Sequence, residues 1–178
     1  IDAALEPWPS PPPVLDYLAA VARLHVALYR GDVDEAESQL RAAPFDLMAR
    51  AGFQHMRILE AWFQGWRALA KRRLGAATRR ARGLRREGVP WARGLAATLE
   101  AGVASREGRL ERALARAREA EATFFEQGMR LHGRALSAWT AELTGSSPEL
   151  ALASVASLGI EAPRAMMRLY VPPALPAS

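Results

Sequence analysis

The stretch Gly108-Arg109-Leu110-Glu111-Arg112-Ala113 decides how the rest of the chain is interpreted, and Gly31-Asp32-Val33-Asp34-Glu35-Ala36 is an earlier counterpart. In both, a glycine is followed two residues later by an aliphatic residue and five residues later by an alanine. Glycine readily adopts the left-handed conformation that ends a helix. The phrase therefore predicts a helical hairpin, with a small residue where the second helix crosses the first.

Apolar residues at helical spacing predict further helices along the whole chain. No segment alternates with period two for long enough to predict a strand. We expect helices at residues 14–30, 33–43, 53–70, 74–86, 91–107, 110–128, 129–144, 148–158 and 163–170. The expected fold class is all-α, an α-solenoid of antiparallel helical hairpins with about eight to nine helices.

A group of acidic residues follows the first turn glycine. Asp32 precedes the expected helix and Glu35 follows three residues later, which is the spacing of a capping box. A calcium loop is the alternative for these acids, but the oxygen ligands and glycine of a 12-residue loop are missing. We therefore predict that Asp32 caps a helix.

The helical domain is expected to span residues 14–171. It follows a Pro-rich linker at 1–13 and precedes a tail at 172–178. The first residue is Ile1 rather than methionine, which suggests a fragment of a longer protein. The chain has no cysteine, which excludes disulfides and thiol catalysis and favours a cytoplasmic location. No apolar run approaches the length of a membrane span.

The hairpins recur at an irregular interval. The alanines that follow the turns, Ala36, Ala77 and Ala113, lie about 41 and about 36 residues apart, as expected for stacked helix pairs. The phrase Gly-x-Leu/Val-x-x-Ala at Gly31 and Gly108 resembles the tetratricopeptide repeat family over roughly residues 14–158. In the copy built on Ala77, Arg72 holds the turn position instead of glycine. The resemblance implies a degenerate repeat that binds proteins.

The stretch Gly159-Ile160-Glu161-Ala162-Pro163-Arg164-Ala165-Met166-Met167-Arg168-Leu169-Tyr170-Val171-Pro172 carries a second resemblance. It is similar to the end of large bacterial, particularly myxobacterial, Ser/Thr protein kinases that append ATPase-like and helical-repeat modules. The resemblance implies that this chain is a regulatory or docking part of a signalling protein. A kinase domain would then lie elsewhere in the parent chain.

Catalytic motifs are missing from the sequence. The only lysine, Lys71, is followed by Arg72, so there is no phosphate-binding Gly-Lys-Ser/Thr loop. The kinase motifs His-Arg-Asp and Asp-Phe-Gly are also absent. His25, His55 and His132 lack metal-ligand spacing. We therefore expect no catalytic residues, no cofactor and no metal.

The candidate binding surface lies in the basic stretch 67–93, which has ten basic residues and one acid, Glu87. Such a stretch could bind phosphates or an acidic peptide, although the alternative is a solvated face of an Arg-rich protein. Trp62, Trp66 and Trp139 are interpreted as core residues, whereas Trp91, after a proline at a turn, is kept as a groove candidate. The candidate surface residues are Lys71, Arg72, Arg73, Arg79, Arg82, Arg86 and Trp91.

The leading hypothesis is a non-enzymatic module that binds a peptide or protein segment, including another part of its parent chain, in a concave helical groove. A nucleic-acid-binding helical module that uses residues 67–93 ranks second. A third alternative is the ligand-sensing tail of an ATP-dependent transcriptional regulator, which would require a pocket between helices.

Overall fold

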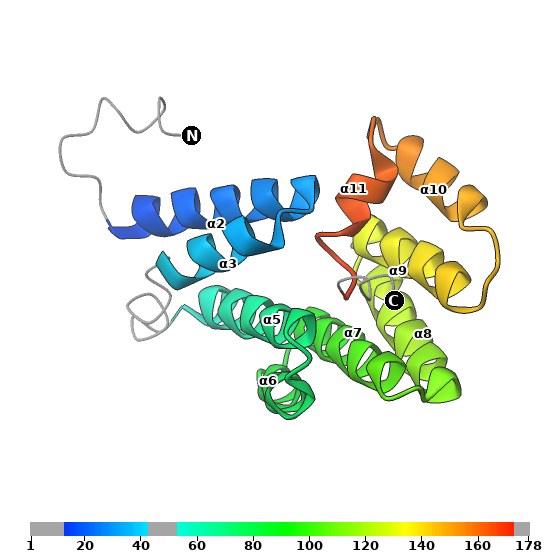
Figure 1. Ribbon diagram of the computed structural model, residues 1–178, viewed down its shortest axis with the longest axis horizontal. Helices are drawn as coiled ribbons and strands as arrows, with labels where there is room; N and C mark the ends of the chain where they lie inside the picture. The colour runs from blue at the N-terminus through cyan, green and yellow to red at the C-terminus, as the bar shows by residue number, and fades with distance from the viewer. Residues whose placement is uncertain (1–12, 43–52, 173–178) are drawn as a thin grey trace.

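The chain is all-α. A computed structural model describes residues 13–42 and 53–172, and this part of the chain contains helices and no strand (Figure 1). The helices are α2 (Pro13–Arg30), α3 (Val33–Ala42), α5 (Gln54–Ala70), α6 (Leu74–Arg86), α7 (Pro90–Arg106), α8 (Leu110–Glu126), α9 (Arg130–Leu143), α10 (Glu149–Ala156) and α11 (Pro163–Met167). The predicted bounds agree to within about two residues, except that the last helix ends at Met167.

The predicted helical domain, residues 14–171, begins and ends close to the limits of the described residues. The predicted linker 1–13 falls outside the described residues except for Pro13, which begins α2. The predicted tail 172–178 also falls outside the described residues, except for Pro172, which is buried.

One backbone arrangement ends most of the helices. At Gly108, φ is +72°, its N–H donates to the carbonyl of Ser105 over 3.1 Å, and the next N–H, of Arg109, donates to Ala104 over 2.9 Å. This pair of bonds is the Schellman motif, which satisfies carbonyls that a helix end leaves without partners. The same pair recurs at the turns centred on Gly31, Arg72, Gly128 and Gly145. The turn predicted from the glycine phrase is thereby confirmed.

The alanines aligned by that phrase are all buried. Ala36, Ala77 and Ala113 are at most 2% exposed, each on the second helix of its turn. Each helix also contacts the next described helix along the chain, and α5 contacts α7. Small side chains at these positions allow the helix axes to come close.

Helix α7 is the centre of the core and is buried on nearly all sides. Its glycines make this possible: a Cβ at Gly94 would lie 2.8 Å from the ring of Phe124, and a Cβ at Gly102 would lie 2.7 Å from Leu69 and 2.9 Å from Pro172. Although α7 is so apolar, none of the described helices combines the length and hydropathy that a membrane span requires.

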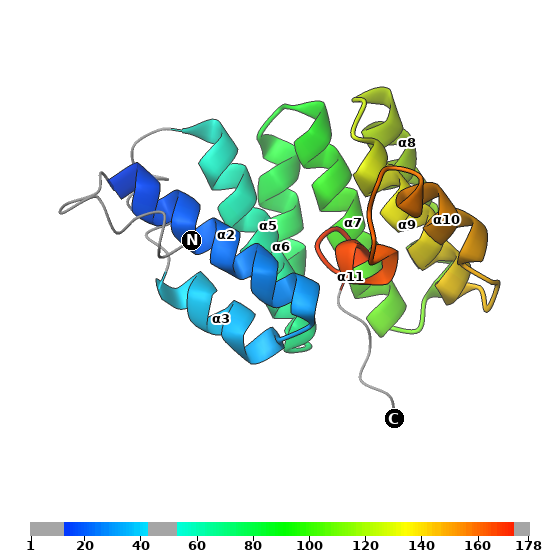
Figure 2. The same cartoon turned by 90° about the horizontal axis from the view of Figure 1, so that it is seen from above.

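The last described helix packs against the C-terminal end of the first. Figure 2 shows α11 beside α2, and α11 also contacts α9 and α10. The Arg168 guanidinium, just after α11, donates to the carbonyl of Tyr29 at the end of α2 over 3.2 Å. Arg164 of α11 pairs with Glu142 of α9 at 2.9 Å and with Glu149 of α10 at 3.3 Å. The C-terminal part of the chain therefore bridges the first helix and the last ones.

Arg72 is the one described residue other than glycine with a positive φ, +54°. The left-handed conformation costs a side-chain-bearing residue about 1 kcal/mol relative to glycine. Arg72→Gly should therefore raise the free energy of unfolding by about 1 kcal/mol, measured by urea denaturation. Arg72→Ala is the control, because it removes the charge but keeps the strained conformation. Equal stability of the two variants would contradict the explanation.

Candidate functional site

A cavity of about 440 Å³ lies where α2, α5, α7, α9 and the segment after α11 converge. Its volume is in the range of small-molecule sites. Most of its wall is aromatic or aliphatic, and its remaining side chains are imidazoles and a phenol. Its polar and large aromatic lining residues include His25, His55, Trp62, Trp91, His132 and Tyr170.

All three histidines of the chain line this cavity, and each contacts an aromatic ring. The His25 ring of α2 lies edge-on to Phe63 of α5, with centroids 5.3 Å apart. The His132 ring of α9 lies 4.2 Å from the ring of Tyr170 and 4.9 Å from that of Phe124. His55 of α5 lies 5.4 Å from Trp91 of α7. The cavity therefore has imidazole edges between aromatic faces.

Burial keeps two of these imidazoles neutral. It lowers the pKa of His132 to about 4, with a further contribution from repulsion by His25. Burial also lowers the pKa of His25, although a hydrogen bond with the backbone of Val21 opposes this. A neutral imidazole offers one hydrogen-bond donor and one acceptor. At neutral pH, His25 and His132 thus act as uncharged polar groups.

The charged and metal-ligating side chains near the cavity are few. No group of three or more histidine, aspartate or glutamate side chains in the part of the chain described here could hold a metal ion. The residues that line the cavity include no carboxylate, lysine or arginine. The arrangement is suited to binding an uncharged ligand.

The candidate residues of the basic stretch do not form one surface. Lys71 pairs with Glu37 of α3, which also accepts from Arg67 at 3.0 Å. The hydrogen bond from Lys71 is the main cause that lowers the pKa of Glu37. These ion pairs attach α3 to the end of α5. Lys71 therefore stabilises the packing of α3 against α5 through its ion pair with Glu37.

Arg79, Arg82 and Arg86 are exposed on α6, and no ion pair to them occurs among the described residues. Arg72 and Arg73 are exposed in the turn that precedes α6. Trp91 is half-buried and belongs to the cavity, beside His55. The predicted surface thus divides into an arginine face on α6 and the aromatic cavity.

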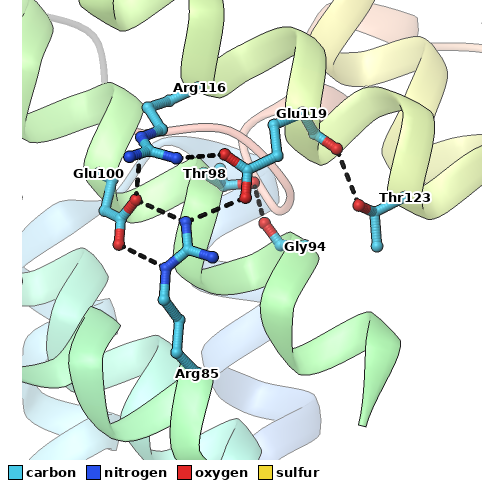
Figure 3. Close-up of polar contacts among 7 residues, drawn as sticks. All are labelled: Arg85, Gly94, Thr98, Glu100, Arg116, Glu119 and Thr123. Carbon is cyan, nitrogen blue, oxygen red and sulfur yellow. Dashed lines mark hydrogen bonds and ion pairs between the residues drawn. The ribbon is translucent and has the colours of Figure 1, made fainter. Parts of the chain in front are cut away.

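Arg85 shows why neighbouring arginines differ. Figure 3 shows it held between Glu100 of α7, at 2.7 Å, and Glu119 of α8, at 3.0 Å. Arg116 of α8 pairs with the same two carboxylates, at 3.2 Å from Glu100. The hydrogen bond to Glu100 is the main cause that raises the pKa of Arg85. Arg85 therefore links α6 to α7 and α8, whereas Arg86 faces solvent.

The prediction that Trp62, Trp66 and Trp139 are core residues is confirmed, since each is at most 7% exposed. The cavity itself was not predicted. Its histidines lie on helices far apart in sequence, and each alone fits the pattern of an amphipathic helix. Two features of the sequence point towards it: the wide apolar arc of residues 53–70, which indicates contact on two sides, and Trp91, which is kept as a groove candidate.

Comparison with known proteins adds no relative. No family model, no curated protein and no solved structure matches the chain.

Acid should destabilise the fold through His132. A histidine whose pKa is lowered from 6.5 to about 4 in the folded state contributes full stability above pH 6.5, and this is lost as pH falls towards 4. Between pH 7.5 and 5 we expect His132 to account for a loss of about 2 kcal/mol in the free energy of unfolding, measured with urea.

His132→Phe should remove that part of the pH dependence, because it retains a ring but cannot take up a proton. His55→Gln is the matched control, since His55 is exposed. The same acid-induced loss in His132→Phe and in the unaltered chain would contradict the assignment.

Proposed function

We propose that this chain is a non-catalytic protein-interaction and regulatory module that binds a segment of polypeptide on the inner surface of a helical array. The observation that carries this proposal is the packing of the chain's own residues 168–172. Leu169, Val171 and Pro172 of this non-helical segment are buried, and Tyr170 lies against His132. A surface that holds one segment in this way is suited to hold another of similar chemistry.

The array is proposed to be a tetratricopeptide-like α-solenoid of antiparallel hairpins. Support comes from the repeated Schellman turns, the buried alanines after them and the direct contact of α5 with α7, which are separated in sequence by α6. In such arrays one hairpin cannot bury both of its faces, so copies stack and generate an extended binding surface. The similarity of the residues from Gly159 to Pro172 to the ends of bacterial Ser/Thr kinases supports a regulatory role in a larger signalling protein.

Trp91 provides the test, because it is half-buried at the cavity beside the packed segment. Peptides selected from a displayed random library against the intact chain should lose at least about tenfold in affinity, or about 1.4 kcal/mol, on Trp91→Ala. Binding is measured by fluorescence anisotropy and helicity by circular dichroism.

Leu110→Ala is the matched control, because Leu110 is a large apolar residue that is 46% exposed at the start of α8. It should change affinity less than about twofold. Failure to enrich any peptide, or enrichment of peptides that bind Trp91→Ala equally well, would refute the proposal.

A nucleic-acid-binding module is the second candidate. It is favoured by the three arginines of α6, Arg79, Arg82 and Arg86, which are exposed and form no ion pair within the described part of the chain. Their spacing along one helix is compatible with contact to successive phosphates. It ranks below peptide binding because charge alone supports it.

Replacing these three arginines with glutamine should reduce the slope of log affinity against log salt concentration for duplex DNA by about 3. The measurement is a fluorescence titration of a short duplex between low and physiological salt. The control makes the same charge change at Arg112, Arg118 and Arg130, which are exposed on α8 and α9. Absence of DNA or heparin binding by the unaltered chain at low salt would remove this candidate.

A further inference from the structure

We propose that the cavity lined by the three histidines binds a flat, uncharged heteroaromatic group about the size of an indole or a purine base. This inference goes beyond the proposed function, because it assigns a ligand chemistry to one cavity and requires no polypeptide partner. It follows from the walls, the polar edges and the charge of the cavity.

The walls favour a planar ring system. Trp62 and Phe63 of α5, Trp91 of α7 and Tyr170 of the C-terminal segment contribute aromatic rings from three different elements. Aromatic rings attract one another in stacked or edge-on arrangements, beyond the effect of apolar burial. At about 440 Å³ the cavity exceeds the space of a single side chain and is within the range of small-molecule sites.

The polar edges favour a ligand that carries ring nitrogens. His25 on α2, His55 on α5 and His132 on α9 present imidazoles from three elements, and each neutral imidazole can both donate and accept a hydrogen bond. Tyr170 adds a hydroxyl that can do the same. A hydrocarbon ring could form no hydrogen bond with these groups, whereas the ring nitrogens of a heteroaromatic group can.

The charge of the cavity disfavours ions. No acidic or basic side chain other than the histidines and Tyr170 lines it in the described part of the chain. A cation would find no carboxylate, and an anion would find no lysine or arginine to replace its hydration. The same argument sets this cavity apart from the space between α2, α3 and α5, where Glu37, Arg67 and Lys71 already pair with one another.

The position of Tyr170 gives such a ligand a structural consequence. Leu169 and Tyr170 form one wall of the cavity, and they belong to the non-helical segment 168–172 that follows α11. A ligand that contacts this wall binds the packed arrangement better than an arrangement in which the segment has moved away. Ligand binding therefore stabilises the packed segment.

Indole is the probe for the test, titrated into the full chain with the methionine methyl groups labelled with carbon-13. The Met129 methyl lines the cavity and should shift in a saturable manner, with a dissociation constant below about 1 mM. Tetramethylammonium at the same concentration should leave it unchanged. N-acetyl-tryptophanamide distinguishes the sources of the group: binding as tight as that of indole indicates a peptide side chain, and weaker binding indicates a free small molecule.

Two variants and one control complete the test. Leu59→Trp fills the cavity and should abolish the shift, and His55→Ala removes one exposed polar edge and should weaken binding about fivefold. Leu150→Trp, at a residue that is 89% exposed on α10, should bind indole like the unaltered chain. A non-saturable shift, binding of tetramethylammonium instead of indole, or equal binding by Leu59→Trp would overturn the proposal.

Discussion

Neighbouring elements approach α7 closely because glycines, which carry no side chain, occupy the points of contact. A Cβ on Gly65 of α5 would lie 2.3 Å from Leu99 of α7, and Gly94 and Gly102 leave similar space for Phe124 and Pro172. Because Leu99, Phe124 and Pro172 are among the most buried side chains, these contacts fix how far α5, α8 and the C-terminal segment stand from α7. Helices α5 and α7 and the C-terminal segment also line the cavity, so Gly65 and Gly102 help to set the distance between three of its walls.

The turns could be predicted from sequence because their signal is local. A positive φ at Gly31 or Gly108 and the buried alanine five residues later are encoded within six residues. At Arg72 the sequence lacks the glycine and the backbone nevertheless keeps the turn, since the bonds from Arg72 to Leu69 and from Arg73 to Ala68 are both made. Tertiary packing overrides the local preference there.

The meeting of the histidines could not be predicted, because no local pattern connects α2, α5 and α9. The ion pairs made by residues of the basic stretch could not be predicted for a related reason. Arg85 and Arg86 are identical in sequence terms, yet a rotation of about 100° per residue directs only Arg85 towards Glu100 and Glu119. Composition therefore overstates the free positive charge of the basic stretch. Trp91 could be kept as a groove candidate from its position after a proline, but its neighbour His55 is visible only in three dimensions.

The contact between Arg168 and Tyr29 joins residues 139 positions apart, whereas most other helix pairs in contact are consecutive along the described chain. In an unfolded chain, closing a loop of that length costs about 4 kcal/mol of chain entropy. After the intervening helices have packed, they already hold the two ends near one another, so most of that entropy has been lost. From this topology we expect the local hairpins to form first and α11 to meet α2 in a late step. Proteins with predominantly local contacts fold fast, and a single distant contact of this kind leaves that property largely intact.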